Sequence, residues 1–431
     1  MKSGNLSWKC TNKLCRALLE TNVAKSEILT LKSGHNHGRL EEAQLERDAI
    51  RKACKRKAVD NLVVKPSKII KTSLVAQGND ILKPEALEGF RQAIYEERRK
   101  IRPVIPKSRA QALDQVNDAE VLTNRGEKFC FVINDLVIVT CKTNLDFLLK
   151  NCDITLADGT FYVSPAHFYQ LYTVHTFANG VYHQIAFGFL PDKTRISYEK
   201  FWSAIQFLCK DLCNGQLSPE VLFLDFESAA INAAQNSFPG IKIRGCPFHL
   251  GQSWYKNTLS GGLSVHYKDN TSEVGKWLKL FFGLPYLDSS DIPEAFLDLM
   301  SIAPNDVNIF KFSDYVLQNY IDEGCLFPPE LWAEPPSLEG PRTTNGAENF
   351  HKHIKSETYN RKPDVHSLIE ILRQWQSTTY LKFKAKKSPD NLSKTQEKLV
   401  EIMMFYAQFR VEGDVLTYLE DIRFHCLPAK I

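Results

Sequence analysis

The sequence predicts an α/β protein with a small metal-binding module and a basic helical region ahead of its main domain. Three observations support this prediction. From about Glu127, short apolar runs of strand character alternate with segments whose apolar residues follow helical spacing. An acidic residue lies at the end of each of two such runs, and a third acidic residue begins a later helix. Two cysteines and two histidines occur in order within the first 37 residues.

The composition is that of a globular protein. Among 431 residues, 43% are hydrophobic and 24% are charged, and at about 150 residues per domain the length suggests two to four folded units. No apolar stretch approaches the roughly 18 residues of a membrane span, and the first thirty residues contain no apolar signal segment. We therefore expect an intracellular protein whose 11 cysteines are reduced thiols or metal ligands.

The first module contains two pairs of soft metal ligands. Cys10 and Cys15 are followed by His35 and His37, a set that suits tetrahedral zinc. So short a segment buries little apolar surface, so a metal would supply the missing stability. Unligated cysteine and histidine are the alternative. Together with Trp8 and the short strand-like runs between the pairs, these residues resemble the second half of the FLYWCH zinc-finger domain.

The next region is basic and helical. Residues 1–110 hold 24 Lys and Arg against 12 Asp and Glu, and residues 111–431 hold 30 against 38. The net charge is therefore +12 in the first segment and −8 in the second. Helices are expected from Glu41 to Asp60 and from Pro84 to Lys100. Phosphate binding, nuclear import and simple solvation are all consistent with such charge runs. The candidate phosphate-binding residues are Arg51, Lys52, Lys55, Arg56, Lys57, Arg98, Arg99 and Lys100.

The main domain begins with strands. Val221 to Leu224 is a short buried strand that ends at Asp225, and Asp158 lies in the run Leu156-Ala-Asp-Gly-Thr-Phe161. The order of these elements is typical of an RNase H-like sheet: three strands joined by hairpins come first, then a crossover helix, then a strand that ends at an acidic residue. Further strands are expected at Phe129–Val139, Asp153–Phe161, Tyr169–Phe177, Gln184–Leu190 and Ile241–Arg244, and helices at Tyr198–Leu212 and Ser228–Asn236.

Three carboxylates are the candidate catalytic residues. In the expected topology Asp158 and Asp225 lie on neighbouring strands, and Glu348 opens a helix at Ala347–Glu357. Two adjacent carboxylates repel each other unless a cation bridges them, and Mg²⁺ or Mn²⁺ bound there could drive phosphodiester chemistry. Taken singly, an Asp beside a Gly can be a turn residue and a first-turn Glu can be solvated.

The motifs around these acids resemble the MULE (Mutator-like) transposase domain. They are Asp158-Gly-Thr-Phe, Leu224-Asp-Phe-Glu, Cys246-Pro-Phe-His249 and Thr343-Thr-Asn-Gly-Ala-Glu-Asn-Phe350. The resemblance covers roughly residues 125–380. It implies a retroviral-integrase-type RNase H-like fold with a helical insertion, in which Asp158, Asp225 and Glu348 form a DDE triad.

The resemblance also implies a division of the chain. We expect a partial FLYWCH-type zinc finger at 1–40, a basic helical region and linker at 41–124, and the first part of the RNase H-like core at 125–260. A helical insertion follows at 261–340, and C-terminal helices that carry the catalytic Glu complete the chain at 341–431.

Three residues are possible accessories to the acids. Three roles are open for Cys246 and His249. They could form half of a metal site that His351 or His353 would complete, they could contact DNA, or they could pack beneath the active site. Glu227, two residues after Asp225, either assists the acids or simply starts a helix.

Two functions of different classes remain open. The first is a nuclear, metal-dependent DNA transposase that binds transposon ends and target DNA, cuts one strand and joins the freed 3′-hydroxyl, working as a homo-oligomer with zinc in its N-terminal module. The second is a domesticated, non-catalytic protein whose DNA binding depends on zinc. An RNA-processing RNase H-like nuclease is less well supported, because the flanking motifs resemble transposases.

Overall fold

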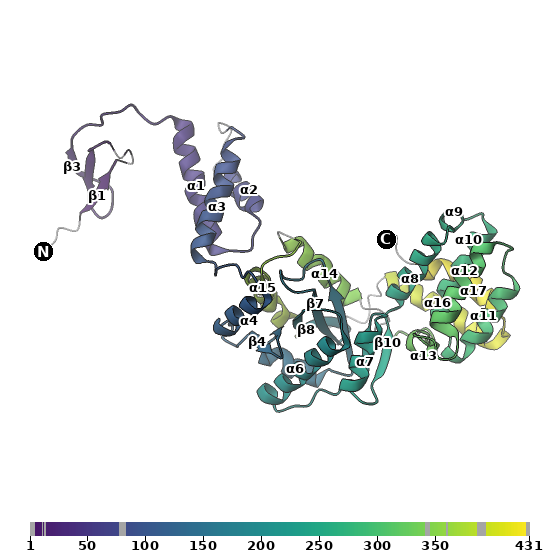
Figure 1. Ribbon diagram of the computed structural model, residues 1–431. Coiled ribbons are helices and arrows are strands. Elements are labelled where there is room, and N and C mark those ends of the chain that lie inside the picture. Colours follow the sequence, from purple (N-terminus) through teal and green to yellow (C-terminus); the bar gives the residue numbers. More distant parts are fainter. Residues whose placement is uncertain are drawn as a thin grey trace. The chain divides into compact units, whose positions relative to one another are not determined.

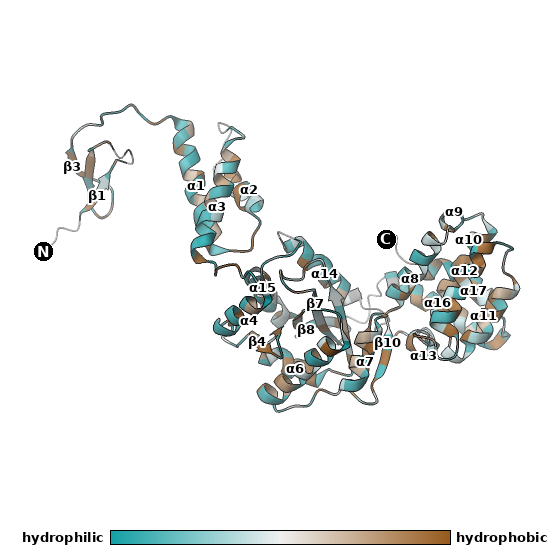
Figure 2. Ribbon diagram, viewed as in Figure 1, coloured by the Kyte–Doolittle hydropathy of each residue, from teal (hydrophilic) through white to brown (hydrophobic). Residues whose placement is uncertain are grey.

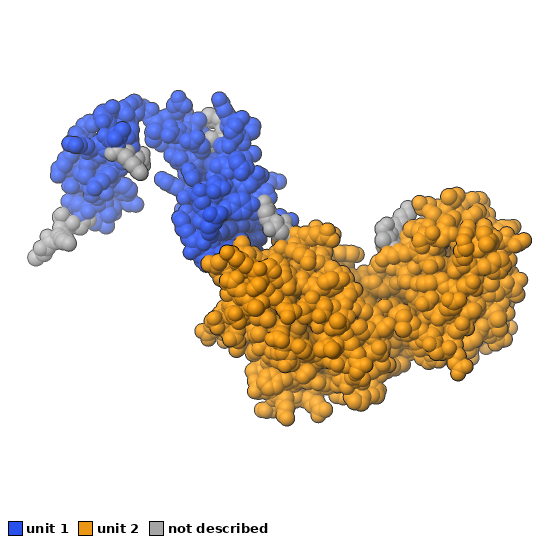
Figure 3. Space-filling view, viewed as in Figure 1, with its two compact units in different colours: residues 1–102 blue, residues 103–431 orange. Residues whose placement is uncertain are grey.

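The computed structural model describes residues 5–10, 12, 14–76, 83–340, 345–358, 361–385 and 394–427 (Figure 1). The chain divides into two compact units, residues 1–102 and residues 103–431 (Figure 3). Within the described ranges, every helix is too short or too polar to cross a membrane. Thr343 and Thr344 of the last motif lie outside the described residues.

The first unit begins with a three-stranded antiparallel sheet in the order β1-β2-β3. Its strands are β1 (Leu6–Lys9), β2 (Leu18–Thr21) and β3 (Ile28–Lys32). Cys15 and Ala17 are its buried apolar residues, whereas Ile28 and Leu31 are exposed. Apolar burial alone is therefore a weak source of stability for this sheet.

Three helices follow, α1 (Glu42–Asp60), α2 (Pro66–Val75) and α3 (Ala86–Ile101). The helices expected near α1 and α3 are confirmed, with ends shifted by one or two residues. Ile50, Phe90 and Ile94 pack in a small shared core, and Figure 2 shows α1 largely in the hydrophilic colour. The three helices therefore bury one face in this core, and α1 is mostly polar outside it.

The second unit contains a seven-stranded mixed sheet in the order β10-β9-β6-β7-β8-β5-β4. The pairs β6–β9 and β9–β10 are parallel, and the other pairs are antiparallel. The strands are β4 (Cys130–Ile133), β5 (Leu136–Val139), β6 (Ile154–Thr160), β7 (Gln170–Ala178), β8 (Val181–Leu190), β9 (Val221–Leu224) and β10 (Lys242–Gly245). The other expected strands are thus confirmed within a few residues, but the expected stretch Phe129–Val139 is divided by a turn at Asn134 and Asp135 into the hairpin of β4 and β5. At the β7–β8 hairpin, Asn179 and Gly180 both have positive φ, as a type I′ turn requires.

Helices cover both faces of this sheet. On β7, Tyr172 packs against Phe201 of α6, while His175 packs against Phe350 of α14. Successive strand residues face opposite sides, so α6 and α14 lie on opposite faces. The helices beside the sheet are α4 (Arg109–Asp118), α5 (Lys142–Lys150), α6 (Arg195–Cys213), α7 (Ser228–Ser237), α14 (Asn345–Glu357) and α15 (Val365–Lys382).

A helical subdomain lies between β10 and α14 along the chain. It comprises α8 (Pro247–Ser260), α9 (Ser264–Lys268), α10 (Glu273–Leu280), η1 (Phe281–Tyr286), η2 (Ser289–Asp291), α11 (Ile292–Ser301), α12 (Val307–Val316), η3 (Leu317–Ile321) and α13 (Pro329–Trp332). The last helices, α16 (Lys394–Glu412) and α17 (Val415–Cys426), pack here and not on the sheet (Figure 1). Arg410 pairs with Asp291 at 2.9 Å, and Tyr418 Oη donates to the Tyr286 carbonyl. The C-terminal segment therefore divides between the sheet and the helical subdomain, a split that the sequence did not predict.

Gly188 permits the close approach of β8 and α6. A Cβ at this position would lie 2.5 Å from the buried ring of Phe201. We expect Gly188→Ala to lower the free energy of unfolding by about 1–3 kcal/mol through overpacking, measured by denaturant unfolding. In a Phe201→Leu background the same substitution should cost less, and an unchanged cost would contradict this packing account.

Candidate active site

The register of two parallel strands brings the first two carboxylates together. Ile154 on β6 pairs with Val221 on β9, and Leu156 pairs with Phe223. The same register, continued for two more residues, places Asp158 opposite Asp225. Because the β6–β9 pair is parallel, both side chains lie toward the carboxyl ends of their strands.

Burial and mutual repulsion perturb both acids. Burial, the charge of Asp158 and a hydrogen bond between the two carboxyls raise the pKa of Asp225 to about 6, although nearby His249 favours its ionised form. Burial likewise opposes ionisation of Asp158, but a hydrogen bond from His351 and the positive charge nearby hold its pKa below the ordinary value. The pair therefore shares a crowded site in which an added cation would be favourable.

Helix α14, which lies far from both aspartates along the chain, supplies the third carboxylate. Glu348 lies in its first turn, and Glu348 Oε1 is 4.0 Å from His249 Nε2. This oxygen is buried and has no hydrogen-bond partner among the described residues. Burial raises the pKa of Glu348, the charge of Asp158 adds to the rise, and His249 opposes it. Asp225 and Glu348 thus both lie beside His249, and Asp158 is near enough for its charge to raise the pKa of both.

Cys246 and His249 do join a potential metal site, but with a partner other than the expected ones. One ligand atom each from Cys246, His249 and Glu348 lies within 4.8 Å of the other two. His249 Nδ1 is also 2.5 Å from Asp225 Oδ1, although neither atom has the geometry of a hydrogen bond. Glu348 therefore takes the place predicted for His351 or His353.

His351 instead contacts the first acid. Its Nδ1 lies 3.3 Å from Asp158 Oδ2, and its Nε2 lies 3.1 Å from the Thr173 hydroxyl. That hydroxyl donates to the Asp158 carbonyl and also contacts His175 Nε2 at 3.0 Å. Burial lowers the pKa of His175 to about 3, so its ring is neutral. Thr173 and His175 are the polar residues on the α14 side of β7, but polar residues occur on its other side too, so nothing local in the sequence reveals this network.

Glu227 lies at a small cavity beside the two aspartates. It accepts hydrogen bonds from Tyr198 Oη at 2.9 Å and from Lys193 Nζ at 3.4 Å. The cavity has a volume of about 60 Å³ and is also bordered by Gln170 and Tyr172. Burial and the surrounding carboxylates raise the pKa of Tyr172 well above its ordinary value, so its hydroxyl stays protonated.

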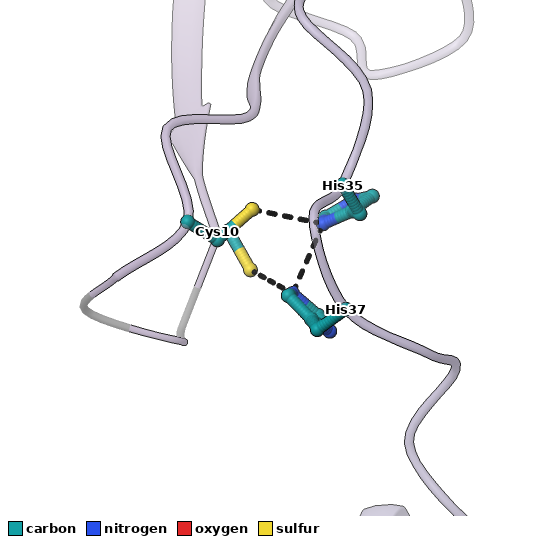
Figure 4. A group of neighbouring side chains, drawn as sticks. Cys10, His35 and His37 are labelled. Atoms are coloured by element: carbon teal, nitrogen blue, oxygen red, sulfur yellow. Dashed lines mark hydrogen bonds between the residues drawn. The ribbon is translucent and has the colours of Figure 1, made fainter.

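The N-terminal cysteines and histidines form a second cluster. Cys10 Sγ lies 3.2 Å from His37 Nε2, Cys15 Sγ lies 3.4 Å from His35 Nδ1, and the two histidine nitrogens are 3.3 Å apart (Figure 4). Tetrahedral zinc with ordinary bond lengths separates S and N ligands by about 3.5 Å and two N ligands by about 3.3 Å. His37 Nδ1 donates to the Gly38 carbonyl at 2.8 Å, which leaves Nε2 as a ligand atom.

The predicted phosphate-binding residues differ in their surroundings. Arg51, Lys52, Arg56, Arg99 and Lys100 are exposed, and Lys55 and Lys57 are half-buried. Lys55 and Lys100 both pair with Glu97 at 2.9 Å.

Arg98 is the exception among these residues because its side chain is buried. Its guanidinium donates to the carbonyls of Asn61 at 2.9 Å and Val64 at 2.6 Å. Arg98 thus joins α3 to the segment after α1, and we remove it from the phosphate-binding set.

Comparison with known proteins identifies one domain family. Residues 154–253 match the MULE transposase domain, a segment that contains Asp158, Asp225, Cys246 and His249. No curated protein matches the chain. The matched domain supports a Mutator-like transposase relationship and implies DNA as a partner.

The raised pKa of Glu348 predicts a pH-dependent effect on stability. Its carboxyl binds a proton more tightly in the folded state, so ionisation above the unfolded pKa, about 4.3, destabilises the fold. Glu348→Gln should therefore raise the melting temperature by roughly a few degrees at pH 8 in a chelator, and leave it unchanged near pH 3.5. A substitution that destabilises equally at both pH values would contradict this account.

Proposed function

We propose that this chain is a DNA transposase of the Mutator-like type. Asp158, Asp225 and Glu348 would act as a DDE triad that cuts a DNA strand and then transfers the freed 3′-hydroxyl to target DNA. The observation that supports this most strongly is the convergence of three carboxylates from β6, β9 and α14 within and beside the matched domain. Action on two transposon ends further suggests a homo-oligomer.

The sheet supports an RNase H-like fold as part of this proposal. Three consecutive antiparallel strands, β6, β7 and β8, precede the crossover helix α6, and β9 and β10 then add in parallel beside β6. In this topology Asp158 lies on β6 and Asp225 directly follows β9, and the helix that follows a long insertion carries the third acid.

The donor atoms fit hard divalent cations. Asp225 Oδ1 and Glu348 Oε1 are buried carboxylate oxygens without hydrogen-bond partners in the described structure, and oxygen ligands of this kind suit Mg²⁺ or Mn²⁺. When bound, the ions would supply electrostatic stabilisation of the reacting phosphate. Asp158, Asp225 and Glu348 would hold them, while His351 orients the Asp158 carboxylate.

The first unit would contribute DNA binding. Cys10, Cys15, His35 and His37 would hold zinc in a FLYWCH-type module, supported by the tetrahedral spacing of their ligand atoms. Exposed cations on α1 and α3 would bind phosphates, and the same charge runs would direct the protein to the nucleus. These features alone would suffice for the second candidate, a domesticated DNA-binding protein without catalysis.

The triad assignment predicts metal-dependent strand cleavage. Full-length protein with Mg²⁺ should nick a duplex that carries the terminal inverted repeat of the element. Asp158→Ala, Asp225→Ala and Glu348→Gln should each lower the rate by about 100-fold or more, because each removes a ligand of the ions that stabilise the reacting phosphate. Gel-resolved cleavage of end-labelled DNA measures this.

Asp211→Ala on α6 is the matched control, since this exposed acid lies outside the cluster. It should cleave at the wild-type rate. Cleavage that persists in all three triad variants would refute the catalytic assignment. Salt-sensitive and chelator-sensitive DNA binding without any cleavage would select the non-catalytic candidate.

The N-terminal cluster predicts zinc content and zinc-dependent DNA affinity. Purified protein should hold one equivalent of zinc there, and Cys10→Ser or His37→Gln should lose it and weaken DNA binding. Elemental analysis and binding titrations measure the two effects. Cys325→Ser is the control, because this cysteine belongs to neither group of potential metal ligands among the described residues, and it should keep the N-terminal zinc. Full zinc content in both N-terminal variants would contradict the assignment.

A further inference from the structure

The cavity beside the aspartates has two walls of different character. Asp158, Asp225 and Glu227 border it on one side, while Gln170 and Tyr172 on β7 border it with an amide and a hydroxyl. Gln170 is 1% exposed and Tyr172 is 3% exposed. Gln170 Oε1 and the Tyr172 hydroxyl are both buried and have no hydrogen-bond partner within the described residues. Buried polar atoms of this kind are uncommon and call for a ligand or a solvent molecule.

The surrounding contacts fix both groups. Gln170 Nε2 donates to Tyr198 Oη at 2.8 Å and to the Asp192 carbonyl at 3.3 Å, so its amide oxygen is the end left for the cavity. The Tyr172 ring packs against the rings of Tyr198 and Phe201 at centroid distances of 5.0 and 5.2 Å. Neither group can turn toward another partner without breaking these contacts.

The backbone of β6 at Gly159 also lies close to the Gln170 side chain. A Cβ on Gly159 would lie 2.4 Å from Gln170 Oε1, so the glycine after Asp158 leaves room for the amide oxygen. Tyr198 Oη, which accepts from Gln170, donates to Glu227 Oε1 at 2.9 Å. A continuous hydrogen-bond chain therefore orders the cavity from β7 to Glu227.

The size and chemistry of the cavity match water. About 60 Å³ accommodates water molecules, each of which needs roughly 10–15 Å³ measured in this way, but does not accommodate a nucleotide. A water molecule can accept a hydrogen bond from the Tyr172 hydroxyl and donate to Gln170 Oε1 and to a carboxylate such as Asp225. The available donor and acceptors thus complement one water molecule next to the acid pair.

We propose that this cavity binds the water molecule that attacks the scissile phosphodiester, and that Tyr172 and Gln170 position it. This inference rests on the proposed transposase function. The water oxygen forms a bond to phosphorus, the bond from phosphorus to the 3′-oxygen breaks, and the 3′-oxygen takes up a proton. The proton lost by water leaves to solvent. Tyr172 and Gln170 remain chemically unchanged.

The two steps of transposition then differ in their need for these residues. In strand transfer the nucleophile is the 3′-hydroxyl of a DNA end, which is part of a nucleotide too large for the cavity. The DNA itself orients that hydroxyl. Loss of the Tyr172 hydroxyl should therefore impair hydrolysis and spare strand transfer.

Tyr172→Phe is the sharpest test, because it removes one oxygen that has no partner within the described protein. We expect hydrolytic nicking to fall by about 10- to 100-fold, while strand transfer of a pre-cleaved end stays within about twofold of the wild type. The melting temperature should not fall. Gln170→Leu should show the same division between the two steps, and Tyr406→Phe on α16 serves as a control for loss of a hydroxyl elsewhere.

The outcomes separate this inference from the function on which it rests. Wild-type hydrolysis in Tyr172→Phe, or an equal fall in hydrolysis and strand transfer, would overturn the water-binding role while leaving the triad in place. A wild-type protein that neither cleaves nor joins DNA would overturn the proposed function and this inference together. Asp158→Ala should lose both steps, which distinguishes a triad residue from a water-positioning one.

Discussion

The parallel pairing of β6 with β9 is the constraint on which the candidate site depends. It fixes Asp158 opposite Asp225, and no shift of register would keep both acids at the same place. The crossover through α6 makes this pairing possible because it returns the chain in the same direction. Helix α14 then brings Glu348 from the other face, so residues far apart in the chain share one site.

Holding these acids together opposes folding, and the surrounding structure compensates. The apolar contacts of α6 with the sheet stabilise the strands that carry the acids. Two histidines contact the acids, with His249 beside Asp225 and His351 beside Asp158. Such arrangements are typical of sites whose stability is lower than that of the fold around them.

The sequence predicted most strands and helices because their apolar periodicity is local, and it predicted the acids because their motifs are short. It did not predict the network of Thr173 and His175, since nothing local shows which face of β7 meets α14. Charge runs were equally uninformative about burial, so Arg98 was grouped with exposed cations although tertiary contacts satisfy its guanidinium. The packing of α16 and α17 on the helical subdomain depends on long-range contacts that no periodicity encodes.

Gly159 and Gln170 occupy facing strands, and the amide oxygen of one fills the volume that a side chain on the other would need. A side chain at position 159 is therefore tolerated only if Gln170 moves or is replaced. A larger residue at 159 requires a shorter one at 170, and that exchange would in turn free Tyr198 from one of its hydrogen bonds. Related proteins with a side chain at position 159 should consequently carry a residue other than Gln at position 170, and the change at 170 should come first.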